Sequence, residues 1–291
     1  MKALLIQHKD AGEGSTSRKA LVEALSDAGW RVDHLPRKKA DAKAITDAKP
    51  DLVVIAGGDG TVAGVIKMLP DRSIPVALIP TGTANDIALS LGVSGDPEEI
   101  IGGWDLERRQ RLDIGNAHGP WGCRAFAEGV GFGAFADSLR LAPDLDGEAK
   151  LEAGRLALRD ALGSAAALPL DITVDGTILP DDLLLVEVMN VRLTGPRLAL
   201  APHAEAGDGR LHIAFIRGSG RDALRDWLDR EVGEAPVERL SGTEIRVKGG
   251  GAMMRIDDEH CWLEPDSEVT IRLEGAPVQI LAPAHASALA G

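Results

Sequence analysis

Cysteine is scarce in this sequence, and long apolar segments are absent. The only thiols are Cys123 and Cys261, and their separation matches no metal-binding spacing. Two lone thiols exclude a disulfide framework and favour a reducing compartment, so we expect a cytoplasmic protein. No run of about 18 apolar residues occurs, which predicts that no helix spans a membrane.

Three common patterns of nucleotide-binding enzymes are also missing. There is no GxxxxGK[ST] loop, which excludes the P-loop class, and no His-Arg-Asp or Asp-Phe-Gly set, which excludes protein kinases. The first predicted strand, residues 2–8, is not followed by GxGxxG, which argues against a Rossmann dehydrogenase.

The charge balance is acidic, because 32 Lys and Arg residues stand against 45 Asp and Glu residues, a net charge of −13. This excess argues against a nucleic-acid partner and makes an anionic membrane surface unfavourable. Two local basic clusters, residues 37–39 and 108–111, face either lipid headgroups or only water. The sequence does not choose between these two interpretations.

The stretch LVVIAGGDGT, residues 52–61, combines a buried strand with a glycine turn. Leu52–Ala56 is apolar and rich in β-branched residues, as a buried parallel strand is, and residues 62–69 form a predicted helix. Glycines let a phosphate approach the backbone, and the N-terminus of a helix offers free N–H groups. The Asp59 carboxylate would repel a bare phosphate, so we expect Asp59 to bind Mg²⁺ or to transfer a proton. The alternative for the whole stretch is a tight strand-to-helix turn with no ligand.

A second strand ends in a similar turn. Residues 75–80, PVALIP, form a predicted strand, residues 81–86 read TGTAND, and a short helix is predicted at 87–91. Loops that follow neighbouring parallel strands meet at the carboxyl edge of the sheet, where ligands bind. We therefore expect the two turns to lie side by side.

The order of predicted elements indicates two domains. Strands alternate with helices over the first hundred or so residues, which predicts a parallel, doubly wound α/β domain. Residues 111–115 and 121–130 are predicted strands joined by a turn at 116–120, and residues 151–168 are a predicted helix. From Asp171 onward strands dominate, with a hairpin turn at Asp175-Gly176, as in a β-sandwich. We predict domains at residues 1–112 and 113–282.

GGDGT followed at this spacing by PTGTAND resembles the diacylglycerol kinase catalytic domain, whose superfamily includes bacterial lipid kinases and sphingosine kinases. Residues 195–204 resemble a family signature that ends in Ala-Pro-x-Ala, and residues 257–259 resemble the family's Asp-Gly-Glu. Four places depart from the pattern, and one of them is Pro196, which replaces the second Gly of the 195–204 signature. Residues 8–12 lack an Asn-Pro, Glu128 replaces an Asn, and Asp258 replaces the Gly of Asp-Gly-Glu. A glycine there suggests a positive φ, which Asp tolerates better than most residues.

The resemblance implies an α/β nucleotide-binding domain followed by a β-sandwich-like domain, with the active site in the cleft between them. It also implies that the last strand, residues 278–281, or the tail, residues 283–291, returns to the first domain. The implied cofactors are ATP and Mg²⁺, and the implied acceptor is a lipid hydroxyl, such as that of diacylglycerol.

The same resemblance assigns site residues. Asp257, with Glu259, is the candidate base, and Asp59 acts through Mg²⁺ or as an acid–base group. Asp208 and Glu205 are candidate ligands of a structural Mg²⁺; the alternative is a β-turn that requires Asp-Gly. The predicted phosphate-binding residues are Gly57, Gly58, Gly60, Thr61, Thr81, Gly82, Thr83 and Asn85.

Two other functions stay open. An NAD kinase-like enzyme would phosphorylate a soluble dinucleotide, since GGDGT also occurs in NAD kinases. The altered residues His8, Glu128 and Asp258 would instead suit a nucleotide-binding regulator that has lost catalysis. For the lipid kinase we expect peripheral, transient contact with the inner face of the membrane. The sequence leaves a homodimer open.

Overall fold

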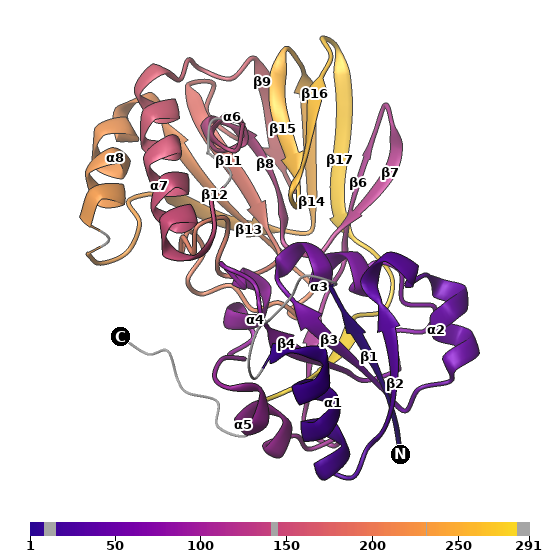
Figure 1. Cartoon of the computed structure of the whole chain (residues 1–291). Helices are drawn as coiled ribbons and strands as arrows, with labels where there is room; N and C mark the ends of the chain where they lie inside the picture. The colour runs from indigo at the N-terminus through magenta and orange to yellow at the C-terminus, as the bar shows by residue number, and fades with distance from the viewer. Residues whose placement is uncertain (9–15, 141–144, 231, 284–291) are drawn as a thin grey trace. The chain divides into compact units, whose positions relative to one another are not determined.

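The computed structural model describes residues 1–8, 16–140, 145–230 and 232–283 (Figure 1). Contacts divide the chain into two compact units. The first comprises Met1–Leu112 and the C-terminal segment from Ala276 onward, and the second comprises Asp113–Gly275.

The first unit is built on a six-stranded sheet in the order β2-β1-β3-β4-β18-β5. Its strands are β1 (Lys2–Gln7), β2 (Arg31–Pro36), β3 (Leu52–Gly57), β4 (Val76–Pro80), β5 (Arg109–Leu112) and β18 (Val278–Leu281). All pairs are parallel except β18 with β5. Every residue of β3 is buried, which explains its unbroken apolar run.

Helices alternate with these strands. They are α1 (Arg18–Asp27), α2 (Ala42–Ala48), α3 (Asp59–Ile66), α4 (Asp86–Ser90) and α5 (Pro97–Gly102). Leu21 and Leu25 of α1 and Ile101 of α5 pack on one face of the sheet. Ser17 caps α1, because its side chain accepts a hydrogen bond from the Ala20 N–H.

The second unit contains two antiparallel six-stranded sheets, in the orders β10-β9-β14-β17-β6-β7 and β13-β12-β11-β8-β15-β16. The strands of the first are β6 (Gly115–Gly119), β7 (Gly122–Phe126), β9 (Leu170–Val174), β10 (Thr177–Ile178), β14 (Glu244–Gly249) and β17 (Ser267–Leu273). Those of the second are β8 (Gly129–Gly133), β11 (Leu183–Met189), β12 (Leu211–Arg217), β13 (Glu238–Gly242), β15 (Ala252–Ile256) and β16 (Glu259–Leu263). Apolar side chains from both sheets share one core, as in a sandwich.

The second sheet is also covered on its other face. Helices α6 (Ala134–Ser138), α7 (Gly147–Ser164) and α8 (Arg221–Arg230) contribute Phe135, Leu158 and Leu224 to a separate core. Strand β11 serves both cores, since Val186 and Val188 join the sandwich core and Met189 joins the helical one. Among the helices of the described segments, none combines the length and apolar character needed to cross a bilayer.

The structure corrects several expected boundaries. The predicted turn at 116–120 is mostly strand β6, and residues 121–130 contain parts of two strands, because the chain turns between Gly119 and Gly122, which pair with each other. Strand β18 pairs with β4 and β5 in the first unit's sheet, as the resemblance implied for the last strand, so the predicted domain end at residue 282 is too late. The predicted helix at 151–168 covers 147–164.

The hairpin at Asp175-Gly176 is confirmed. Both residues have positive φ, 48° and 83°, and the flanking residues Val174 and Thr177 pair across β9 and β10. This backbone geometry is the one that two-residue hairpin turns favour.

Candidate active site

The two glycine turns meet in the first unit, as the sequence predicts. The Thr81 N–H donates to the Gly57 carbonyl at 3.1 Å, so both turns begin side by side. A Cβ atom on Gly82 would lie 2.4 Å from the Gly58 Cα, and one on Gly58 would lie 3.0 Å from the Gly82 Cα. No side chain fits between these backbones, which explains glycine at both positions.

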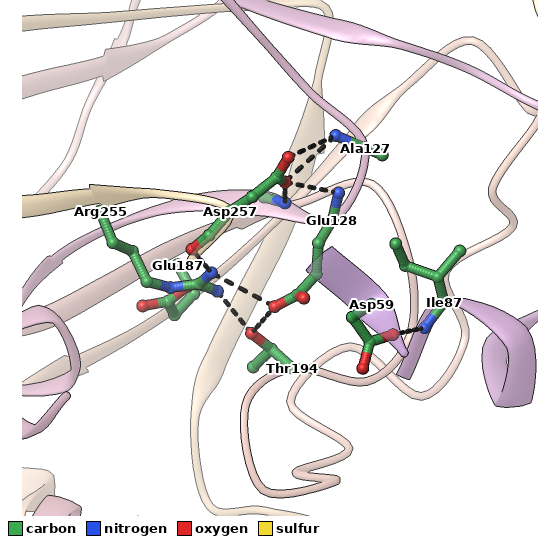
Figure 2. Close-up of polar contacts among 9 residues, drawn as sticks. Asp59, Ile87, Ala127, Glu128, Glu187, Thr194, Arg255 and Asp257 are labelled. Carbon is green, nitrogen blue, oxygen red and sulfur yellow. Dashed lines mark hydrogen bonds and ion pairs between the residues drawn. The ribbon is translucent and has the colours of Figure 1, made fainter. Parts of the chain in front are cut away.

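Asp59 joins the two turns. It lies in the first turn of α3, which begins at Asp59 rather than at the expected Val62. Its Oδ1 accepts a hydrogen bond of 2.9 Å from the Ile87 N–H at the start of α4 (Figure 2). Burial raises the pKa of the Asp59 carboxyl group, while the N–H groups of Ile87 and Asp86 act in the opposite direction. Asp59 therefore caps a helix that begins in the second turn.

Asn85 shapes the second turn from within. Its backbone is left-handed, with φ 57° and ψ 38°, a conformation that Asn tolerates better than most residues. Its Oδ1 accepts from the Gly82 N–H at 2.9 Å, and its Nδ2 donates to the Gly82 carbonyl at 2.8 Å. The side chain that we expected to line the phosphate site thus holds Gly82 in place.

These turns fit a phosphate group. Gly60 and Gly82 are exposed, so their backbones are open to a ligand. The Thr81 hydroxyl oxygen is buried and has no hydrogen-bond partner within the described part of the chain. The first turn of α3 adds N–H groups that lack helical partners, and such groups favour an anion. The Thr61 side chain packs against Gly57. A Cβ atom added to Gly57 would lie only 2.6 Å from the Thr61 Cβ.

Asp257 lies in the second unit, in the two-residue turn between β15 and β16, where Ile256 pairs with Glu259. Only 4% of Asp257 is exposed. Its Oδ1 accepts from the N–H groups of Ala127 at 3.1 Å, Glu128 at 2.9 Å and Gly129 at 3.4 Å (Figure 2). The carboxyl group is therefore fixed against the segment that joins β7 to β8.

The turn corrects one expectation about the departure at position 258. The residue with positive φ is Asp257, at 50°, and not Asp258. Asp258 and Glu259 are both exposed. An aspartate at 258 therefore imposes no left-handed strain.

A buried ionic network beside Asp257 was missed by the sequence reasoning. Only 2% of Arg255 and 0% of Glu187 is exposed, and Arg255 Nη2 donates to Glu187 Oε2 at 2.7 Å. Arg255 Nη1 donates to Glu128 Oε1 at 3.2 Å. The Thr194 hydroxyl accepts from Arg255 Nη2 and donates to Glu128 Oε1 at 2.8 Å. Glu128, noted only as a departure, thus has a defined partner (Figure 2).

The charges in this network depend on one another. Burial alone would lower the pKa of Arg255, but the Glu187 and Glu128 carboxylates hold it above its ordinary value. Burial raises the pKa of Glu187, and the charge of Arg255 opposes that shift. A charged residue in the middle of the apolar strand LLLVEVM was the signal for this network, because a buried carboxylate requires a partner.

Of the two predicted metal ligands, Asp208 has partners within the protein. Asp208 Oδ1 accepts from the Arg210 N–H at 2.8 Å, and its Oδ2 is 3.1 Å from His212 Nε2. Glu205 is exposed. Within the segments that the structure describes, no three or more His, Cys, Asp or Glu side chains gather as a metal site would require. The side chains of these two residues therefore fit a protein-held Mg²⁺ poorly, and we derive no step through one.

Asp113 organises the same loop and was not singled out from the sequence. It is 7% exposed, and its Oδ2 accepts from the Gly209 N–H at 2.8 Å. Its own N–H donates to the Ala206 carbonyl at 2.7 Å. These two bonds explain the shape of the Asp208-Gly209 turn without a metal.

Known proteins resemble this chain over its whole length. Residues 2–117 match the family described as "Diacylglycerol kinase catalytic domain". A "Probable lipid kinase YegS-like" protein of Pseudomonas fluorescens is 30% identical over 293 residues, which cover 96% of this chain and 89% of the relative. The "Diacylglycerol kinase" of Mycobacterium tuberculosis (strain CDC 1551 / Oshkosh) is 29% identical over 184 residues, and the match spans only 57% of that relative.

Solved structures share the fold. A crystal structure of a diacylglycerol kinase from Bacillus anthracis aligns with a TM-score of 0.71 at 22% identity, covering 97% of this chain and 96% of the other. An NAD kinase from Archaeoglobus fulgidus, solved in complex with ATP, aligns with a TM-score of 0.57 at 15% identity, covering 97% and 94%. With its paired glycine turns and its full-length relatives, this chain belongs to the diacylglycerol kinase catalytic-domain family.

Proposed function

We propose that this protein is a lipid kinase, which transfers the γ-phosphoryl group of ATP to the hydroxyl of a lipid such as diacylglycerol. The observation that carries the proposal is the contact between Gly58 and Gly82, where two glycine backbones meet with no room for a side chain and the Gly82 backbone is exposed. Family membership supports the same activity, because relatives named as lipid kinases match nearly the whole chain.

The first unit would bind the triphosphate of ATP. The turn residues Gly58 and Gly82 allow close approach, and the Thr81 hydroxyl, which has no hydrogen-bond partner among the described residues, would donate to a phosphate oxygen. In phosphoryl transfer, positioning and neutralisation of phosphate charge account for most of the catalysis. Mg²⁺ bound to ATP supplies part of that neutralisation. Asp59 would act by holding the second turn in place, through its bond to Ile87.

The second unit would supply the base. In the transfer, the lipid hydroxyl oxygen forms a bond to the γ-phosphorus while the bond to the β-phosphate oxygen breaks and ADP leaves. The hydroxyl proton passes to the Asp257 carboxylate, with Glu259 as the neighbouring acidic group. The N–H groups of residues 127–129 donate to the carboxylate and so hold Asp257 in a fixed orientation. The Glu259 carboxylate is exposed, and within the described segments no hydrogen bond holds it in this way.

The acceptor is proposed as a lipid at a membrane surface, met by peripheral and transient contact on the cytoplasmic side. A net charge of −13 predicts weak attraction to anionic bilayers. We therefore expect transfer in neutral mixed micelles to exceed transfer on anionic vesicles of the same lipid content.

The test is phosphoryl transfer from labelled ATP with Mg²⁺ to a panel of micellar lipids. The panel contains diacylglycerol, sphingosine, ceramide and phosphatidylglycerol, with NAD as a soluble acceptor in parallel. The variant Asp257→Asn should lose transfer, and Asp47→Asn, an exposed position on α2, should keep it. Label in NAD alone would identify an NAD kinase, and bound ATP without transfer would identify a non-catalytic regulator. Full activity of Asp257→Asn would show that another group is the base.

A further inference from the structure

Arg255 uses its whole guanidinium group inside the second unit. It donates twice to Glu187, through Nε at 3.2 Å and Nη2 at 2.7 Å. It donates to Thr194 through Nη2, and to Glu128 and the Asp257 carbonyl through Nη1, at 3.2 and 2.8 Å. An arginine carries five N–H donors, and these bonds can occupy them all. The Phe135 ring lies below, with its centroid 4.8 Å from the Arg255 Cζ.

This network holds Asp257 from two sides. Arg255 binds its main-chain carbonyl, and the N–H groups of residues 127–129 bind its carboxylate. Glu128 belongs to both sides, because its N–H donates to Asp257 while its carboxylate accepts from Arg255 and Thr194. A shift of Arg255 therefore moves both the turn and the segment against which the Asp257 carboxylate rests.

We propose that Arg255, fixed by Glu187, Glu128 and Thr194, is the positioning residue for Asp257 in the phosphoryl-transfer reaction. The effect on catalysis rests on the proposed function. The restraint on Asp257 rests only on the hydrogen bonds described above. Gly131 is part of the arrangement, since a Cβ there would lie 2.0 Å from Glu187 Oε1. Arg255 does not touch the reacting atoms and acts through Asp257.

Thr194 offers the sharpest test because its hydroxyl both accepts and donates within the network. It is completely buried, and Thr194→Val keeps its shape while removing the hydroxyl. Thr194→Ser keeps the hydroxyl and is the matched control. We expect Thr194→Val to lower kcat for lipid phosphorylation at least about tenfold, since small displacements of a catalytic group have effects of this order. The KM for ATP should change little, and Thr194→Ser should restore most of the kcat.

A second measurement keeps the restraint testable without activity. Hydrogen–deuterium exchange of the two variants and the original protein would be compared for peptides containing residues 127–129 and 255–259. Faster exchange at these peptides in Thr194→Val, with Thr194→Ser unchanged, would support the restraint. Equal exchange in all three proteins, or acceleration spread evenly over both units, would overturn it.

The two readouts separate the two proposals. If the original protein phosphorylates no lipid, the proposed function fails, and the exchange result still decides whether the network restrains Asp257. If the original protein is active and Thr194→Val keeps its kcat, the positioning role fails while the lipid kinase stands.

Discussion

Replacing Gly82 by alanine should separate the two glycine turns. The added Cβ would lie 2.4 Å from the Gly58 Cα, 3.1 Å from the Gly58 nitrogen and 2.9 Å from Asn85 Oδ1. The nearest atoms belong to backbone, so the clash cannot be relieved by turning a flexible side chain. The φ of Gly82 is not positive, so the effect would be steric rather than conformational.

The clash sets the expected size of the effect. Inserting a methyl group where no space exists typically costs about 1–3 kcal/mol in folding free energy, because backbone or side chains must shift. We expect Gly82→Ala to lower the free energy of unfolding of the first unit by about that amount in urea denaturation. Because the turn must move away from Gly58, the affinity for ATP, measured by calorimetry, should fall as well.

Gly102 provides a matched control at the end of α5. A Cβ there would meet nothing within 4 Å, and the residue is exposed. Alanine at a helical glycine is worth up to about 1 kcal/mol of added stability, so Gly102→Ala should be neutral or stabilising. If Gly82→Ala matched Gly102→Ala in both stability and ATP affinity, the two turns would not be in contact, and the basis of the proposed ATP site would be refuted.

Three further substitutions test other contacts in the structure. Asp59→Ala removes the cap on the Ile87 N–H and should lower the free energy of unfolding by about 0.5–2 kcal/mol, together with ATP affinity; unchanged stability would contradict the capping role. Gly131→Ala would place a Cβ 2.0 Å from Glu187 Oε1 and should reduce the melting temperature, whereas an unchanged melting temperature would mean that Glu187 does not occupy that space. The pKa of Asp175 is lowered, chiefly by the N–H groups of Glu244 and Thr243. A lowered folded pKa gives stability that is present above the unfolded pKa of about 3.9 and is lost as pH falls through the folded value. Asp175→Asn, which suits the same positive φ, should therefore be less stable than the original protein at pH 7, with the difference vanishing in acid; a difference independent of pH would contradict this.

The paired glycine turns could be predicted because their causes are local. A buried β-branched run at 52–56 requires a parallel strand, and Gly-Gly-Asp-Gly directly after it requires a turn into a helix. The turn at Asp175-Gly176 was likewise readable, since few residue pairs accept two positive φ values. The predicted start of α3 at Val62 was wrong, because Asp59 and Gly60 suit both a loop and a first helical turn, and the structure has them in the helix.

Periodicity and turn chemistry act over a few residues, so they predicted the elements of the first unit, the strand-rich character of the second and the glycine turns. The family resemblance implied that the last strand returns to the first domain, but its place between β4 and β5, more than 160 residues away in the sequence, became clear only from the tertiary structure. It alone brought Glu128, Glu187 and Arg255 together, from strands or strand ends far apart in the chain. Long-range pairing is set by which buried surfaces and charges complement each other, and no local pattern records that choice.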